Sequence, residues 1–259
     1  AVNEPGSDQK FSHDEQYSLW EKVLVDNIFV ICKTPMAKSI TKRTLLGFRD
    51  AKINAHCFED LINTLKDRPR QFIERITRRS FWKKGDGPMK FDAVVGNPPY
   101  QIEGSNTRKA PIYHLFYDTA FNISAKVTLI TPGRFLFKVG ETPKEWMDTM
   151  LLDQHLKVVK YFSKSTDIFP TVDIKGGVAI TYRDTNKILG PIGFFSSSVE
   201  LASITSKVSA HKDFHEGRFS ELVSSQGIYR FSEIALETFP EITKLSGKGT
   251  GDKITSRII

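Results

Sequence analysis

The amino-acid sequence predicts an α/β fold with a largely parallel β-sheet. Short runs rich in apolar and β-branched residues alternate with segments whose apolar residues have helical spacing, the pattern of strands joined by helices. The length of 259 residues allows one large α/β domain, or one such domain and part of another. With 39% hydrophobic and 26% charged residues, the composition excludes a disordered chain.

The first part of the chain is expected to contain three strands and two helices. Residues 1–18 are polar and include Pro5 and Gly6, so we expect a linker or an unstructured terminus there. Pro35 is expected to close the first strand at a turn, and a Gly- and Pro-rich break precedes the third strand. The predicted strands are residues 27–32, 51–58 and 91–96, the predicted helices are residues 36–48 and 59–79, and the break is residues 83–89.

The following part is expected to contain two more helices and three more strands. The helices are predicted at about residues 112–123 and 143–155, and the strands at residues 127–132, 158–163 and 176–183. Too few residues separate the last two strands for a helical crossover, so we expect them to pair antiparallel. Beyond about residue 196 the chain is rich in Ser, Lys and Gly, which indicates the beginning of a second unit.

The charge balance favours an acidic partner such as nucleic acid. Lys and Arg number 37 against 30 Asp and Glu, a net charge of +7. No apolar run reaches the roughly 20 residues that a membrane helix needs, and the N-terminus lacks the apolar core of a signal peptide. We therefore expect a cytoplasmic protein with no membrane partner. Cys32 and Cys57 lack metal-ligand spacing, so we expect two buried free thiols and no metal site.

A strongly basic segment runs from Arg68 to Lys84 and contains the aromatic pair Phe81 and Trp82. Such a segment can follow the phosphates of a nucleic acid, with the aromatic side chains stacking on bases. The solvated face of an ordinary helix is an equally good interpretation. The sequence leaves both open.

The most informative segment is the tetrapeptide Asn97-Pro98-Pro99-Tyr100, which directly follows the predicted strand 91–96. A polyproline-type turn at the end of a strand is the simpler interpretation. The position, however, is the one at which an open α/β sheet binds its ligands. An Asn side-chain oxygen and a proline carbonyl can accept the two hydrogens of a conjugated amino group, and so direct its nitrogen lone pair at a methyl donor. Tandem prolines hold such a loop rigid and remove backbone donors.

The segment FDAVVGNPPYQ resembles the motif of S-adenosylmethionine-dependent amino-group methyltransferases, above all the adenine-N6 DNA methylases. Within that class it is most similar to the methylases of fused bacterial restriction–modification enzymes. The resemblance runs from about Asn27 to Tyr182 and includes three further segments: NIFVICKTPMA, IYHLFYDTAFNISAKVTLITPGRFL and DIFPTVDIKGGVAITYR. It implies a Rossmann-like methyltransferase sheet, mostly parallel, with an antiparallel strand near its end.

The resemblance also implies roles for individual residues. Asn97 and the Pro98 carbonyl would hold the target amine, and Pro99 would stiffen the loop. Tyr100 and Phe169 would stack on either side of an adenine flipped out of the duplex. The implied cofactor is S-adenosylmethionine and the implied partner is double-stranded DNA, with further domains or subunits of a restriction–modification enzyme. An ordinary core position is an equally good interpretation of Phe169.

Two features depart from the family pattern, and both concern the cofactor. The acidic, Gly-rich loop that follows the family's first strand has no convincing copy; residues 4–8 (EPGSD) are a faint match, and GKGTG at 247–251 lies at the wrong end. The carboxylate expected to bind the ribose hydroxyls aligns near Cys32. Asp60 and Asp86 are the remaining candidates for the cofactor's adenine, and a solvated surface carboxylate is the simpler interpretation of each.

We therefore expect residues 1–195 to be a methyltransferase catalytic domain that lacks its first-strand Gly-rich loop. Residues 196–259 would begin a DNA-recognition or linker region. Two alternatives remain: an amino-group methyltransferase acting on protein glutamine or RNA, and a non-catalytic DNA-binding fragment. The residues that bind the cofactor are not assigned by the sequence.

Overall fold

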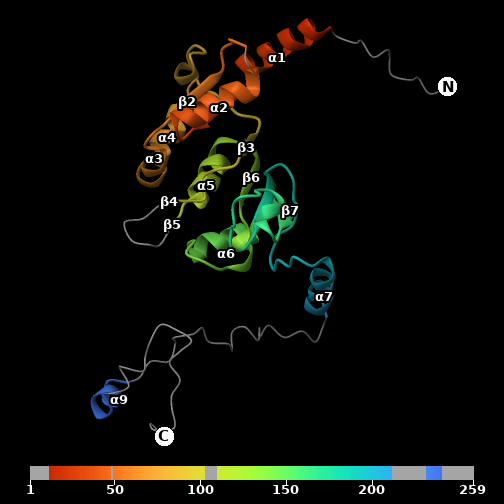
Figure 1. Cartoon of the computed structure of the whole chain (residues 1–259). Helices are drawn as coiled ribbons and strands as arrows, with labels where there is room; N and C mark the ends of the chain where they lie inside the picture. The colour runs from red at the N-terminus through yellow and green to blue at the C-terminus, as the bar shows by residue number, and fades with distance from the viewer. Residues whose placement is uncertain (1–11, 48, 103–109, 212–231, 241–259) are drawn as a thin grey trace, which may run out of the picture. The chain divides into compact units, whose positions relative to one another are not determined.

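The computed structural model describes residues 12–47, 49–102, 110–211 and 232–240. The chain divides into two units, Ala1–Ala202 and Ser203–Ile259, and every described strand belongs to the first (Figure 1). In the part of the chain that is described, no helix is both long and apolar enough to cross a membrane.

The first unit begins with a small α/β layer. Strands β1 (Phe29–Cys32) and β2 (Asn54–Cys57) pair in parallel. Helix α1 (His13–Asn27) starts earlier than expected, because Ser12 forms a capping box with Glu15: its hydroxyl accepts from the Glu15 amide, and the Glu15 carboxylate accepts from the Ser12 amide. The expectation of an unstructured terminus is therefore wrong for residues 13–18.

The expected helix over residues 36–48 is confirmed as α2 (Pro35–Leu46), but its proline has a different role. Pro35 is the first residue of the helix, where its missing N–H costs nothing, and the Thr34 hydroxyl caps the helix by accepting from the Ala37 amide at 3.1 Å. The turn expected at Pro35 is thus a helix start.

The expected helix at 59–79 is broken in two. Helix α3 (Leu61–Asp67) ends at Asp67, and after Arg68 helix α4 (Pro69–Ile76) begins with a proline, which has no N–H to continue the preceding helix. A short 3₁₀ turn, η1 (Arg79–Trp82), follows, and the Gly- and Pro-rich residues 83–89 then lead toward β3 as expected.

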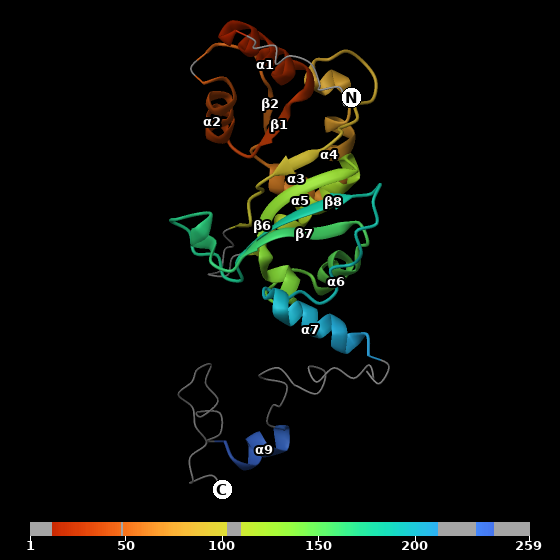
Figure 2. The ribbon, with the colours of Figure 1, turned by 90° about the vertical axis from the view of Figure 1, so that its right-hand side faces the viewer.

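The second sheet has four strands in the order β3-β6-β8-β7. Figure 2 shows β6, β8 and β7 side by side. Strand β3 pairs with β6 in parallel, whereas β8 lies between β6 and β7 and is antiparallel to both. The predicted antiparallel pairing of the last two strands is confirmed. The strands are β3 (Val94–Gly96), β6 (Lys126–Pro132), β7 (Leu156–Phe162) and β8 (Val178–Asp184).

The expectation of a mostly parallel sheet with an antiparallel strand near its end is confirmed in part: β3, β6 and β7 run in one direction, and β8, between β6 and β7, runs against them. Among the described residues only the β1–β2 and β3–β6 pairs are parallel. Residues 163–177 connect β7 to β8 without an α-helix, which favours antiparallel pairing, and β8 is antiparallel to β6 as well. The fold is mixed α/β.

Two apolar clusters hold the first unit together, and helix α5 (Tyr113–Ile123) belongs to both. One cluster joins α5 and α6 (Lys144–Leu152) to the four-stranded sheet; in it Tyr113, Tyr117 and Phe135 are fully buried. The other joins α3, α4 and η1 to β1, with Leu115, Phe116 and Ile123 of α5 packed against it. The remaining short elements are the hairpin strands β4 (Gln101–Ile102) and β5 (Ala110–Pro111) and the 3₁₀ turns η2 (Gly133–Phe137) and η3 (Ser165–Asp167).

Helix α7 (Val199–Ser209) spans the boundary between the two units, and helix α9 (Glu233–Thr238) belongs to the second. The Ser232 hydroxyl caps α9 by accepting from the Ala235 amide. Residues 212–231 and 241–259, most of the expected DNA-recognition region, lie outside the described residues, and so does the GKGTG segment. The division at 195/196 and the role of the second region stay predictions.

Candidate active site

The tetrapeptide Asn97–Tyr100 leaves the carboxyl end of β3, which lies in the parallel part of the four-stranded sheet. Asn97 is exposed, and the three residues that follow are half-buried. The loop is tied to α5 because the Ile112 amide donates to the Tyr100 carbonyl at 3.1 Å. The structure thus places the loop at the sheet edge where open α/β folds bind ligands.

Within the loop, the side chains of Asn97 and Tyr100 are hydrogen-bonded. The Tyr100 hydroxyl donates to Asn97 Oδ1 at 2.7 Å. Burial raises the pKa of Tyr100 to about 12, so the phenol keeps its proton and remains a donor at neutral pH. An amide oxygen has two lone pairs. Tyr100 therefore fixes the orientation of the Asn97 amide and leaves one acceptor position on Oδ1 unoccupied.

The Pro98 carbonyl is a second acceptor in the loop. No hydrogen bond reaches it from any residue that the structure describes. Pro99 has no N–H and restricts the conformation of Pro98, so the carbonyl is presented by a stiff backbone. The loop therefore offers two neighbouring oxygen acceptors, Asn97 Oδ1 and the Pro98 carbonyl.

A buried hydroxyl network behind the loop sets the position of α5 against the sheet. The Tyr117 hydroxyl lies 2.7 Å from Thr181 Oγ1 on β8 and 3.0 Å from Thr131 Oγ1 on β6. All three side chains are buried, and burial raises the pKa of Tyr117. Sequence reasoning did not find this network, since its members are up to 64 residues apart and no local signal joins them.

Phe169 is half-buried in the loop between η3 and β8. The turn is closed by the Ser165 hydroxyl, which donates to the Val172 carbonyl and accepts from the Ile174 amide, each at 2.8 Å. No ring contact joins Phe169 to Tyr100 in the described structure. Its role as the second stacking aromatic stays a prediction.

The residues that the sequence suggests for cofactor binding lie on or after the parallel β1–β2 pair, or in the break before β3. Cys32, at the end of β1, is buried with its sulfur 3.9 Å from Thr41 Oγ1, whereas Cys57 is half-buried. Asp60 is exposed beyond β2, and its carboxylate accepts from Asn63 Nδ2 at 2.6 Å. Asp86 is exposed in the break before β3. Residues 4–8 lie outside the described residues.

Helix α5 packs into the apolar cluster of each sheet, yet no described strand joins the two sheets. β1 pairs only with β2, and β3 pairs only with β6, among the residues that the structure covers. Val95 on β3 leaves 78% of its surface exposed, unusual for a valine in a strand. Among the described residues, the outer edge of β3 and both edges of the β1–β2 pair are therefore unpaired.

In the basic segment Arg68–Lys84, some side chains have partners within the fold and others have none among the described residues. Trp82 is buried, with its indole N–H donating to the Ile76 carbonyl at 2.7 Å, so it belongs to the core and cannot stack on a base. Arg79 Nε donates to the Lys84 carbonyl, and Lys84 pairs with Asp26 at 3.7 Å. Arg78 has no side-chain partner among the described residues.

Comparison with known proteins identifies the class. Residues 26–169, more than half of the chain, match the Eco57I restriction-modification methylase family. The chain therefore belongs to this family, which confirms the resemblance inferred from the Asn-Pro-Pro-Tyr motif.

Two individual proteins are also similar. A Mycoplasma pneumoniae protein named as an uncharacterized adenine-specific methylase is 30% identical over 105 residues, which cover 38% of this chain and 25% of that protein. The chain thus spans about a quarter of the length of this relative. A crystal structure of Thermoplasma acidophilum protein 1320 matches with a TM-score of 0.31 and 15% identity over 62% of this chain and 68% of that chain.

Proposed function

We propose that this chain carries the catalytic loop of a site-specific DNA adenine-N6 methyltransferase of a restriction–modification system. The observation that carries the proposal is the pair of available acceptors, Asn97 Oδ1 and the Pro98 carbonyl, at the carboxyl end of β3. Membership of a restriction-modification methylase family supports it, and so does the similarity to a protein named as an adenine-specific methylase.

The chemistry follows from the nature of the substrate nitrogen. The exocyclic amine of adenine donates its lone pair into the ring and is a poor nucleophile. When Asn97 Oδ1 and the Pro98 carbonyl each accept one of its hydrogens, the nitrogen is held in place and can become pyramidal, which returns the lone pair to the nitrogen. Tyr100, half-buried beside Asn97, would stack on the base once it is flipped out of the duplex.

S-adenosylmethionine is the donor that the family resemblance implies; when bound it supplies an electrophilic methyl group. The described residues fit it only in part. Asp60 offers an exposed carboxylate beyond β2, but no described strand is followed by a Gly-rich loop, and Cys32 cannot bind a ribose as a carboxylate does. We therefore assign no cofactor-binding residue. Calorimetric titration of the chain with S-adenosylmethionine tests the point, since clear one-site binding would rule out a non-catalytic fragment.

Transfer itself is tested with tritiated S-adenosylmethionine and duplex DNA, followed by hydrolysis and chromatography of the nucleosides. Label in N6-methyladenine supports the proposal. Label that enters RNA or protein glutamine, and never DNA, would show the alternative amino-group methyltransferase instead. The sequence dependence is checked with duplexes of different sequence in parallel.

A further inference from the structure

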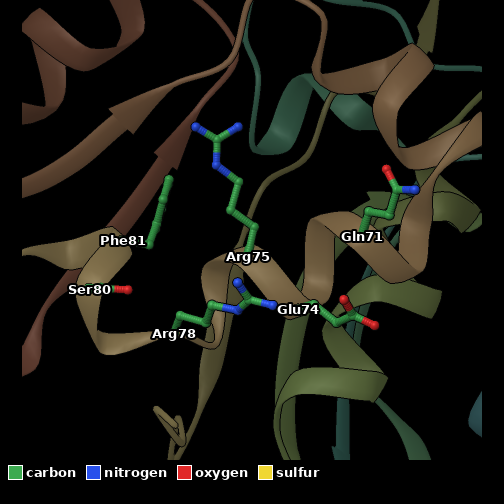
Figure 3. A pocket seen from close by; sticks show the side chains of 6 residues that line it. All are labelled: Gln71, Glu74, Arg75, Arg78, Ser80 and Phe81. Atoms are coloured by element: carbon green, nitrogen blue, oxygen red, sulfur yellow. The ribbon is translucent and has the colours of Figure 1, made fainter. Parts of the chain in front are cut away.

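A polar hollow lies beside helix α4 and the turn η1, apart from the catalytic loop. It has a volume of about 450 Å³, and Figure 3 shows its lining side chains: Gln71, Glu74, Arg75, Arg78, Ser80 and Phe81. A second hollow of about 430 Å³ shares Glu74, Arg78 and Ser80 and extends to Thr77, Gly87 and Pro88. Two guanidinium groups and a hydroxyl therefore face a space that is open to solvent.

Arg75 is held in position without using its hydrogen-bond donors. Its guanidinium lies 5.1 Å from the ring centre of Phe81 and 5.4 Å from that of Phe58. Contacts with aromatic rings leave the N–H groups unpaired, and no carboxylate pairs with Arg75 among the described residues. The side chain is thus pre-organised for an incoming acceptor, which lowers the entropy lost on binding.

The surroundings carry an excess of positive charge. The pKa of the nearby His56 lies below its ordinary value, mainly because burial disfavours the charged ring, and also because Lys38, Arg75 and Lys83 repel a proton there. Glu74 is the single acidic side chain that lines either hollow in the described structure. Lys83, like Arg78, has no ion-pair partner among the residues described. A group with negative charge would be stabilised here.

The geometry favours a phosphate over a base. The ring of Phe81 already contacts the His56 ring at 4.2 Å and the Phe58 ring at 5.8 Å, in addition to Arg75. It therefore serves as a support for Arg75 and offers little free surface for stacking. Exposed cations on the same segment, Arg68 and Arg70, extend the positive charge beyond the hollow, as contact with a continuous backbone requires.

We propose that the hollow formed by Arg75, Arg78 and Ser80 binds a phosphodiester group of the DNA backbone independently of base sequence. The choice of DNA as the source of the phosphate rests on the proposed function. Arg75 and Arg78 donate charge-assisted hydrogen bonds to the phosphate oxygens, and the Ser80 hydroxyl donates a third.

The experiment measures binding of the 259-residue chain to short labelled duplexes of two unrelated sequences, by fluorescence anisotropy between about 50 and 200 mM salt. Arg78→Gln is the main variant because the Arg78 side chain has no hydrogen-bond or ion-pair partner among the described residues. We expect affinity to fall about fivefold for both duplexes, and the slope of log K against log salt to fall by about 1. Lys22→Gln, an exposed cation on α1, is the matched control and should change neither quantity.

Three further variants bear on the same claim. Arg75→Lys keeps the charge and should bind more tightly than Arg75→Gln, although loss of the ring contacts can affect folding in both. Glu74→Gln removes the acid that lines both hollows and should tighten binding about two- to fivefold. An Arg78→Gln variant that binds like wild type, or a wild-type chain that does not bind duplex DNA, would overturn the proposal.

Competition between duplex DNA and a free polyphosphate shows which of the two supplies the phosphate that the hollow binds. If tripolyphosphate or ATP binds at micromolar concentration in an Arg78-dependent way while duplex DNA does not, the site serves a free polyphosphate and the proposal is wrong. If Arg78→Gln weakens DNA binding but the wild-type chain transfers no methyl group to DNA, the phosphate site stands and the proposed function fails independently.

Discussion

The catalytic loop and the basic hollow are built in opposite ways. The loop Asn97–Tyr100 is continuous in sequence, and its key hydrogen bond joins residues three positions apart. The hollow takes side chains from α4 and η1 and depends on His56 and Phe58, near the end of β2, to support Phe81 and Arg75. The loop could therefore be identified from the sequence as a motif, whereas the basic segment Arg68–Lys84 could be identified only as a candidate phosphate contact, and the folded chain decides which of its side chains are available.

Because of this difference, substitutions in the loop should reduce methyl transfer, whereas substitutions in the hollow should reduce DNA binding. The largest effect is expected for Asn97→Ala, in the loop. Loss of the acceptor should reduce methyl transfer by at least about 10²–10³-fold, because the amine is no longer held for attack. The fold and the affinity for duplex DNA should remain. Transfer of tritium and anisotropy on the same samples measure both, with Asn122→Ala, an exposed position on α5, as the control. Retained transfer would remove Asn97 from the mechanism.

Tyr100→Phe separates stacking from the hydrogen bond that orients Asn97. The variant keeps the ring but loses the donor to Asn97 Oδ1, so we expect transfer to fall about fivefold, the value of one ordinary hydrogen bond. Tyr100→Ala should lose considerably more, because the ring is then also absent. Equal losses in the two variants would mean that the hydroxyl contributes everything and that the ring does not stack on the base.

Tyr117→Phe tests the scaffold that positions the loop against the sheet. Removal of the hydroxyl deprives Thr131 and Thr181 of one buried hydrogen bond each. The free energy of unfolding, measured by urea titration, should therefore fall by about 1–3 kcal/mol. Tyr161→Phe, whose hydroxyl donates to the Gly176 carbonyl at a solvent-accessible site, is the matched control and should cost less. A smaller loss for Tyr117→Phe than for Tyr161→Phe would contradict the network's structural role.

The smallest expected effect is on the free energy of unfolding in acid. It concerns one histidine on α5, the helix that follows the catalytic loop, and one histidine beside the hollow. Burial lowers the pKa of His114, on α5, and of His56, beside the hollow. The unfolded chain then binds more protons than the folded chain below about pH 6.5, so stability is full above that pH and declines as the pH falls toward the folded pKa values.

Urea titrations of wild type and of His114→Gln across this range measure the effect. The variant should lose less stability in acid than wild type does. Bound DNA should reduce the contribution of His56, because a phosphate nearby favours its protonated form, and leave that of His114 unchanged. An identical decline in the variant and in wild type would contradict the assignment to His114.

Much of the fold and of the loop was predictable because the signals are local. The apolar runs gave the strands β1, β6 and β8 within a few residues, and the short β7–β8 connection indicated their antiparallel pairing. Local chemistry also explains the errors. The Ser12–Glu15 capping box begins α1 inside a segment that looked unstructured, and Pro69 divides a helix that looked continuous.

The sequence by itself determined the α/β class, the Asn-Pro-Pro-Tyr loop at the end of a strand, and through these the methylase family. Only the tertiary structure decided that β8 lies between β6 and β7, that Trp82 is core, and that Arg78 is free while Arg79 is not. The physical reason is range: propensity and turn chemistry act over a few residues. Whether a side chain is buried, or a charged group is paired, depends on which distant segments pack against that residue.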